Sequence, residues 1–287
     1  MSASMKVGTL ALAGLAGAAG QLLMAWGAQA AVLKADYRFD NSFASSVAGA
    51  PNLTPVDPLG SSSFGTDTVF GTNASVYNFA GGNLPASSQG GFAFDNSAGL
   101  LTSNSYSVDV SFKFNERSGA WRRIIDVQDR ASDAGFYVDP SNNLDIYPQS
   151  GSSSPFTTGQ YYDVVLTVGN GTATAYLNGV LQFSYVTTIM DISNADNPRN
   201  LVNFFLDNTQ GGGQGEWSSG SIARLALYDG ALTAGEIRTN FDTPLPPVVT
   251  PPATAVPEPG SALLLISATA MLLGTSRRKR AAPDVAA

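Results

Sequence analysis

The feature that most constrains the fold is an alternation of apolar and polar residues with a period of two. In YSVDVSFKF, which begins at Tyr106, every second residue is apolar or aromatic. Successive side chains of an extended chain point to opposite faces, so this stretch has one apolar face. The pattern predicts a strand that packs on a core through that face.

Two tight-turn signals divide a later stretch into three further runs of this kind. YYDVVLTV begins at Tyr161 and is followed by Gly169-Asn170-Gly171, and the next run ends at Asn178-Gly179. Asn-Gly favours the left-handed backbone conformation that two-residue hairpin turns require. These residues predict a β-meander of three strands.

The composition favours an all-β body and excludes much of enzyme chemistry. Charged residues make up only 13% of the chain, a balance that favours short strands and turns over helices held by ion pairs. The chain has no Cys and no His. This excludes thiolate and imidazole nucleophiles, haem ligation through His, and zinc sites built from these ligands.

The charge of the body limits its partners. Between residues 31 and 257, ten Lys and Arg stand against twenty Asp and Glu, a net charge of −10. Nucleic acids and anionic lipids require clustered cations on the protein surface. We therefore expect no nucleic-acid partner, and neutral glycans or divalent cations suit this body better.

The last part of the body predicts one more strand and a brief helix. SGSIARLALYDGALTAGEI alternates and then reaches Thr233, with Glu236 three residues further on. This spacing is typical of a capping box at a helix N-terminus.

The N-terminus resembles a secretory signal peptide. Lys6 precedes an uncharged Ala/Gly-rich stretch, and Ala28 and Ala30 supply small residues at positions −3 and −1 of a cleavage site. We expect residues 1–30 to form a signal helix that is removed after Ala30. An uncleaved anchor helix is the alternative, because no charge occurs between Val7 and Gln29.

The C-terminus contains a linker and an apolar segment. Residues 244–256 are Pro-rich, which predicts an extended linker. The 17 residues from 260 to 276 carry no charge, and a helix of that length spans about 25 Å, close to the bilayer core of about 30 Å. We expect a C-terminal transmembrane helix whose flanking cations stay cytoplasmic.

The tail as a whole, residues 257–280, resembles the PEP-CTERM sorting signal of bacterial exported proteins, and residues 281–287 follow as a short tail. The motif residues are Pro257, Glu258, Pro259, Arg277, Arg278, Lys279 and Arg280. The resemblance implies processing by an exosortase, a membrane cysteine protease. It also implies export across the bacterial inner membrane, retention in the membrane through the C-terminal helix, and then a place at the cell surface or in the extracellular matrix. A permanent anchor is the alternative.

The body, residues 31–243, resembles a LamG-like module of the concanavalin A-like lectin and glucanase superfamily. The residues that carry the resemblance are ADYRFDNS from Ala35, WRRIIDV, AYLNGV and LYDGALTAGEI. It implies a two-sheet antiparallel jelly-roll sandwich in which ADYRFDNS is the first strand. First and last strands are commonly neighbours in such folds.

The resemblance implies a candidate Ca²⁺ site, because LamG-like modules often hold this ion at the rim of one sheet. Carboxylate and amide oxygens suit such a hard cation. The candidate ligands are Asp40 at the end of the first strand and, in the Gly-rich loop before the last strand, Asp207, Asn208 and Glu216. The alternative is that these side chains are solvated or cap turns.

Trp121 and Trp217 are the candidate glycan-binding residues, and Tyr147 and Tyr161 are weaker candidates. Aromatic faces stack on sugars, but most aromatic side chains of a sandwich fill its core. No catalytic residues are assigned, because the E-x-D-x-E pattern of glucanases in this superfamily is absent.

These observations predict a non-enzymatic exported bacterial protein that binds extracellular polysaccharide or mediates adhesion. Two alternatives stay open. One is a glycan-active hydrolase with an unrecognised acidic pair that includes Glu216 or Asp126, and the other is a purely structural envelope or matrix component.

Overall fold

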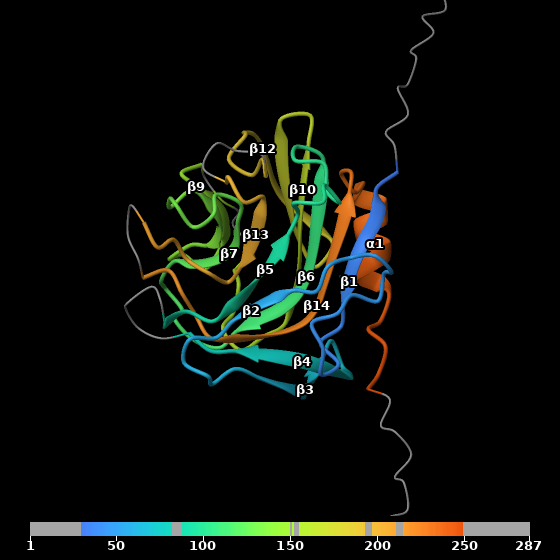
Figure 1. Ribbon diagram of the computed structural model, residues 1–287, viewed down its shortest axis with the longest axis vertical. Coiled ribbons are helices and arrows are strands. Elements are labelled where there is room, and N and C mark those ends of the chain that lie inside the picture. Colours follow the sequence, from blue (N-terminus) through green and yellow to red (C-terminus); the bar gives the residue numbers. More distant parts are fainter. Residues whose placement is uncertain are drawn as a thin grey trace, which may run out of the picture.

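Two antiparallel sheets packed face to face make up the part of the chain that the computed structural model describes, which is residues 30–81, 88–149, 151, 155–192, 197–210 and 215–248 (Figure 1). The eight-stranded sheet has the order β12 (Val180–Val186), β11 (Thr172–Leu177), β10 (Tyr162–Gly169), β6 (Tyr106–Phe114), β14 (Gly220–Asp229), β4 (Thr72–Phe79) and β3 (Ser63–Val69), and β1 (Val32–Tyr37) also pairs with β14. The six-stranded sheet has the order β2 (Thr54–Val56), β5 (Gly91–Asp95), β13 (Leu201–Phe204), β7 (Arg122–Asp126), β8 (Gly135–Val138) and β9 (Leu144–Tyr147). The predicted all-β sandwich of two antiparallel sheets is confirmed.

The predicted strand and meander are confirmed in β6 and in β10, β11 and β12. The apolar face of β6 is fully buried. At the two turns of the meander, Asn170 and Asn178 each have a φ of 51°, and Gly171 and Gly179 follow with φ of 69° and 73°. Two successive residues at positive φ are the hairpin geometry that Asn-Gly favours. The turn residues therefore set the register of three neighbouring strands.

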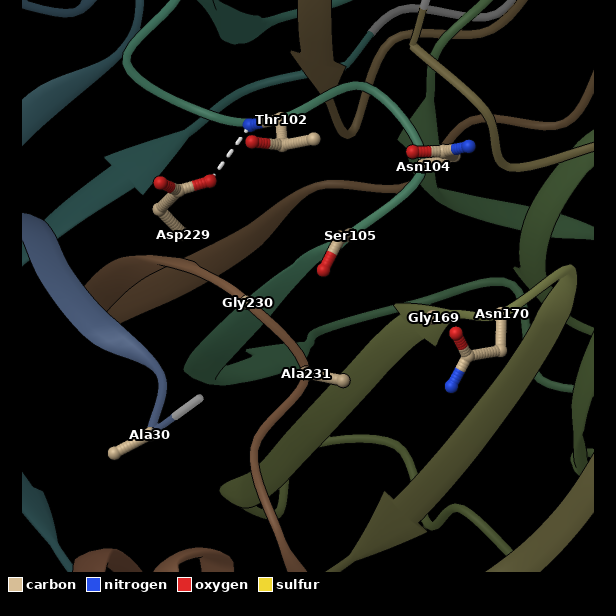
Figure 2. Close-up of a pocket in the computed structure, with 9 residues that line it drawn as sticks. All are labelled: Ala30, Thr102, Asn104, Ser105, Gly169, Asn170, Asp229, Gly230 and Ala231. Atoms are coloured by element: carbon tan, nitrogen blue, oxygen red, sulfur yellow. Dashed lines mark hydrogen bonds between the residues drawn. The ribbon is translucent and has the colours of Figure 1, made fainter. Parts of the chain in front are cut away.

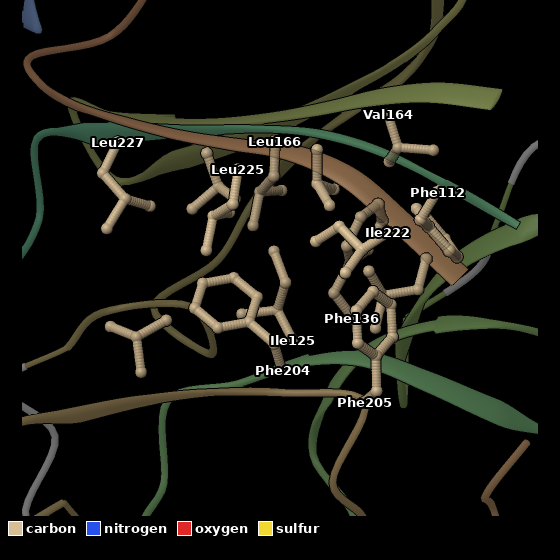
Figure 3. Close-up of a cluster of buried hydrophobic side chains, with 14 of the residues drawn as sticks. Phe112, Ile125, Phe136, Val164, Leu166, Phe204, Phe205, Ile222, Leu225 and Leu227 are labelled. Atoms are coloured by element: carbon tan, nitrogen blue, oxygen red, sulfur yellow. The ribbon is translucent and has the colours of Figure 1, made fainter. Parts of the chain in front are cut away.

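The hydrophobic core lies between the two sheets. Leu225 of β14 points across the interior toward Ile125 of β7 and Phe204 of β13 (Figure 3), and all three are fully buried. The ring of Phe205 stacks on that of Phe79 from the opposite sheet, with centroids 4.2 Å apart and an interplanar angle of 6°. Each such side chain stabilises the sandwich by about 1.5–3 kcal/mol relative to an exposed one.

The helix α1 (Ala234–Asp242) packs on the outer face of the eight-stranded sheet. The side chain of Thr233 accepts a hydrogen bond from the backbone of Glu236, whose carboxylate accepts one from the backbone of Thr233 at 2.8 Å. The predicted capping box is therefore confirmed. Ile237 is fully buried and packs with Val165 and Ala226, which are apolar residues of β10 and β14.

The first strand is shorter than the sequence predicted. The expectation was a strand over residues 35–42, but β1 ends at Tyr37 because Phe39 and Asn41 have φ of 55° and 58°. Such left-handed residues do not fit a strand. The turn buries the ring of Phe39, 5.7 Å from that of Phe92. The expected pairing of the first and last strands is confirmed, since β1 is antiparallel to β14.

The predicted localisation, in which a C-terminal helix holds the chain in a membrane, is corrected by the structure. Within the described residues, no helix is long and apolar enough to cross a bilayer. The nine-residue α1 is far below the roughly 20 residues that a span requires. The predicted signal helix before Ala30, with Ala28, and the predicted sorting signal at 257–280 both lie outside the described residues.

Candidate functional site

The outer face of the six-stranded sheet carries a cluster of buried polar side chains. Alternation directs Phe136 and Phe204 into the core. The neighbouring residues Arg123, Tyr137 and Asn203 point away from it and meet there. We call the group Arg123, Asp126, Tyr137, Asp207 and Glu216 the Arg123 cluster.

Asp126 fixes the base of the Arg123 cluster. It is fully buried and accepts hydrogen bonds from the Arg123 guanidinium at 2.8 Å, the Asn203 amide at 3.0 Å and the Arg130 backbone at 2.9 Å. Burial raises the pKa of Asp126, and the positive charge of Arg123 opposes that rise. The carboxylate and the guanidinium hold each other in place, because either charge alone would be costly to bury.

Asp207 and Glu216 form a carboxyl pair above this base. The two side chains share a hydrogen bond. Burial, and then the negative charge of Asp207, raise the pKa of Glu216 to about 8, while Arg123 acts in the opposite direction. The guanidinium lies 3.5 Å from Asp207 and 4.0 Å from Glu216. Both carboxyl groups therefore lie beside the Arg123 cation.

The Asp207–Glu216 pair is also fixed through its backbone. The N–H of Glu216 donates to the Asp207 carboxylate at 3.0 Å, and the N–H of Arg123 donates to the carbonyl of Glu216 at 2.9 Å. The N–H of Asp207 donates to the side chain of Gln89 at 2.7 Å. These bonds connect the loop before β14 to β7, so the polar groups are held in a defined geometry.

The structure brings only some of the proposed calcium ligands together. Asp207 and Glu216 come together and Asn208 follows directly, but its side-chain amide donates to the carbonyl of Gln210 at 3.0 Å. Asp40 lies on the outer face of the other sheet, at a cavity of about 490 Å³ that Ala74 and Ala223 also line. In the described ranges, no three Asp or Glu residues are placed to hold a metal ion. The Arg123 guanidinium supplies the positive charge beside these carboxyl groups.

A row of three aromatic side chains, Tyr147, Trp121 and Tyr137, leads from the surface to the Arg123 cluster. The Trp121 ring meets Tyr137 and Tyr147 edge-on, with centroids 5.5 Å and 5.6 Å away. Tyr147 is 40% exposed and Trp121 is half-buried, whereas Tyr137 is buried and its hydroxyl contacts the Arg123 guanidinium. The Arg123 guanidinium also lies over the Tyr137 ring, 4.7 Å from its centroid. The row therefore combines an accessible aromatic surface with fixed polar groups.

Trp217 is not part of this accessible surface. It is only 8% exposed, and the Arg117 guanidinium lies 5.0 Å from the ring centroid. Its other neighbour is the backbone at Gly81, where an added Cβ would lie 2.6 Å from the ring. The indole of Trp217 is therefore packed within the fold, and its ring offers no open face to a sugar. Tyr161 is likewise 8% exposed.

Sequence reasoning did not single out Arg123, the residue that organises the site. The signal is visible in WRRIIDV, where two arginines stand in a strand that is buried throughout. Arginine is rarely buried unless it is paired, so a strand of this kind predicts buried acidic partners. Arg122 turns the other way and hydrogen-bonds to Asn142 at 2.6 Å.

A second carboxyl pair lies beneath α1 and is not accessible. Asp109 of β6 and Asp163 of β10 share a hydrogen bond, and burial raises the pKa of both, that of Asp163 well above the usual range. Arg224 lies 3.3 Å from Asp109, and Asn240 of α1 donates to Asp109 at 3.3 Å. This pair attaches the helix to the sheet.

A separate cavity of about 380 Å³ opens at one end of the sandwich (Figure 2). The backbone N–H of Thr102 donates to the Asp229 carboxylate at 2.8 Å, and Lys34 lies 3.8 Å from the same carboxylate. Its lining residues are Ala30, Thr102, Asn104, Ser105, Gly169, Asn170, Asp229, Gly230 and Ala231. With no aromatic side chain among these residues, the cavity lacks the stacking surface that the row around Trp121 provides.

Comparison with solved structures places the fold among known sandwiches. Domain 4 of AbnA, a GH43 extracellular arabinanase from Geobacillus stearothermophilus, is 21% identical with a TM-score of 0.53, over 75% of this chain and 100% of that domain. The binding domain of botulinum neurotoxin DC is 12% identical with a TM-score of 0.51, over 75% of this chain. That of Paraclostridial Mosquitocidal Protein 1 is 12% identical with a TM-score of 0.50, over 74% of this chain. The chain covers 51% and 52% of these two toxin chains, about half of each.

The family is shown by sequence as well. No curated protein matches the chain. The Laminin_G_3 family model, described as the concanavalin A-like lectin/glucanases superfamily, matches residues 86–238, more than half of the chain. This match and the two-sheet architecture agree, and the chain belongs to the concanavalin A-like lectin/glucanases superfamily.

Proposed function

We propose that the protein is a non-enzymatic carbohydrate-binding protein and that it binds glycans on the outer face of the six-stranded sheet. Trp121 and Tyr147 supply the stacking surface, and Glu216, whose side chain is 18% exposed, supplies a hydrogen-bonding group. The observation that carries the proposal is the contact of the half-buried Trp121 with the exposed Tyr147 at the edge of the fixed Arg123 cluster. Sugars are bound by this combination of an aromatic surface and a few oriented polar groups.

The charge of this face supports neutral glycans as the ligand class. Carboxyl groups outnumber guanidinium groups around it: Asp126, Asp133, Asp145, Asp207 and Glu216 stand against Arg123 and Arg130. A uronate or sulfated sugar would meet like charges here, which costs binding energy. Neutral sugar hydroxyls can instead donate to the partly exposed carboxyl group of Glu216.

The similar structures support carbohydrate as the ligand class. The arabinanase domain was solved in complex with arabinotriose, and the neurotoxin DC domain in complex with SialylT. At 21% and 12% identity these likenesses concern the fold, so the choice of face and residues rests on the geometry around Trp121.

Hydrolysis is the second candidate function, and the spacing of the carboxyl groups argues against it. Glycosidases hold their two carboxyl groups about 5–5.5 Å or about 6.5–9.5 Å apart, with the glycosidic bond between them. Asp207 and Glu216 share a direct hydrogen bond instead. Asp109 and Asp163 share one too and are buried under α1. A direct hydrogen bond is closer than either glycosidase spacing, which favours binding over cleavage.

A glycan array, combined with an assay for released hydrolysis products, separates these functions. We expect the wild type to retain neutral glycans without releasing shorter products. Trp121→Ala should lose the signal. Phe70→Ala should keep it, because Phe70 is an exposed aromatic residue, at 48% against 40% for Tyr147, and lies between β3 and β4, away from this face. Product release that is lost in Glu216→Gln would establish the enzyme, and a blank array would favour the structural role.

Processing by an exosortase remains a prediction from the tail, whose residues lie outside the described part of the chain. The resemblance of Pro257-Glu258-Pro259 and the cations from Arg277 to Arg280 to a PEP-CTERM signal supports it. Intact-mass measurement of the native protein tests it directly. A mass that ends near Pro257 supports processing, and a mass that includes Ala287 refutes it.

A further inference from the structure

The strand β12 is a sheet edge that carries neither a charge nor a proline. Among the described residues it pairs with β11 on one side and forms the end of the eight-stranded sheet (Figure 1). An edge strand presents unpaired N–H and C=O groups to any other extended chain. Proteins protect such edges with charges, proline, bulges or very short strands.

The other edges of the two sheets have such protection. β3 contains Asp67, which forms an ion pair with Lys113 at 2.6 Å. β2 has three residues and contains Pro55, and β9 has four residues and contains Asp145. β1, which pairs with β14, contains Lys34. Each of these strands resists pairing with another chain.

β12 differs from these edges in its lack of charge and in the exposure of its apolar side chains. It has seven residues, VLQFSYV, with neither a charge nor a proline. No charged residue occurs between Asp163 and Asp191, so β11 and the turns on both sides of it are uncharged as well. Val180 and Leu181 are each 56% exposed, and Val186 is 86% exposed. Exposed apolar side chains on an uncharged edge are typical of an interface.

A bulge leaves half of β12 regular. Ala175 pairs with Phe183 while Tyr176 pairs with Leu181, so Gln182 is the extra residue. From Phe183 to Val186 the register with β11 is continuous. This regular half, which includes the exposed Val186, is the part of β12 that can accept another strand.

We propose that β12 pairs with β12 of a second copy of this chain, antiparallel about a two-fold axis. A two-fold axis brings identical segments together, so a charged strand would face its own charge. The chain has a net charge of −7, and most of its surface would repel a copy of itself. The uncharged residues 164–190 avoid this repulsion, and pairing buries Val186 and satisfies the free edge. The two eight-stranded sheets then form one continuous sheet.

The mass of the full chain in solution, measured by light scattering over a concentration series, tests this proposal. Val186→Lys places like charges across the two-fold axis, and Leu59→Lys is the matched control, because Leu59 is 52% exposed and lies outside β12. We expect a dimer for the wild type and for Leu59→Lys, and dimerisation at least tenfold weaker for Val186→Lys with an unchanged melting temperature. A monomeric wild type, or a dimer that Val186→Lys leaves intact, would overturn the proposal.

A crosslinking measurement covers the case in which the lysine variant does not fold. The chain has no cysteine, so Ser184→Cys introduces a single thiol on the exposed side of β12. A short bifunctional maleimide should join two copies of Ser184→Cys and should leave Leu59→Cys monomeric. Absence of the covalent dimer, or equal crosslinking of both variants, would contradict pairing through β12. Neither experiment depends on glycan binding.

Discussion

Replacing Arg123 with methionine would remove a cation that contacts three carboxyl groups of the candidate site. The guanidinium lies 2.8 Å from Asp126, 3.5 Å from Asp207 and 4.0 Å from Glu216. Arg123, Asp126 and Asp207 have fully buried side chains. Methionine keeps a long flexible apolar chain, so the change removes charge and hydrogen bonds more than volume.

The expected loss of stability follows from the buried charges that remain. Removing one partner of a buried ion pair typically costs about 3–5 kcal/mol, a large part of a total of about 5–15 kcal/mol. For a domain of this size, about 2–4 °C per kcal/mol gives a fall in melting temperature of about 6–20 °C near pH 7. Burial already raises the pKa of Asp126, and losing Arg123 would raise it further. In the variant, Asp126 therefore takes up a proton more readily as the pH falls. The loss of stability relative to the wild type becomes smaller near pH 5.

Thermal and urea unfolding at both pH values measure this effect. Arg238→Met is the control, because Arg238 pairs with Asp242 at 2.8 Å with side chains 56% and 54% exposed. An exposed pair of this kind contributes about 0–1 kcal/mol. If Arg123→Met changed stability no more than the control, or by the same amount at both pH values, the account of a charge-balanced cluster would be wrong.

Three further predictions concern pH, metal and a turn. Since the pKa of Glu216 is raised from 4.5 to about 8, its contribution to stability is complete below the unfolded value and is lost as pH rises through about 8. Glu216→Gln should thus give a melting temperature that changes less with pH between about 4.5 and about 8. A pH dependence parallel to that of the wild type would count against a raised pKa of Glu216. Because Arg123 already balances these carboxyl groups, added Ca²⁺ or EDTA should leave the melting temperature unchanged, and a rise with Ca²⁺ that Asp207→Asn abolishes would instead support the calcium site that the sequence predicted. Gly179→Ala should cost about 1–2 kcal/mol in urea unfolding, because its φ is 73°, and no loss would contradict the turn geometry.

The parts of the fold that were predicted correctly are those that local sequence patterns determine. Alternation in β6, the Asn-Gly turns and the capping box at Thr233 depend on residues close together in the chain. The end of β1 depended instead on a distant partner, since the left-handed turn at Phe39 buries that ring against Phe92. The strand was therefore predicted too long, and Asp40 was placed beside Asp207 although it lies on the other sheet.

The candidate site was predictable only in part, for the same reason. Glu216 and Asp207 could be chosen as a pair because they share one loop. Their partner Arg123 lies 84 residues before Asp207 in the chain, and only the fold brings it between them. The burial of Trp217 likewise depends on the distant backbone at Gly81. Long-range contacts decide which aromatic residue is exposed, and a single sequence does not contain them.

Calorimetric titration with the best neutral glycan from the array tests the central claim most directly. The account predicts saturable binding by the wild type and by Phe70→Ala, and binding at least tenfold weaker, a loss of about 1.4 kcal/mol or more, for Trp121→Ala and Tyr147→Ala. Equal affinity of Trp121→Ala, Tyr147→Ala and the wild type would contradict a glycan site on this face.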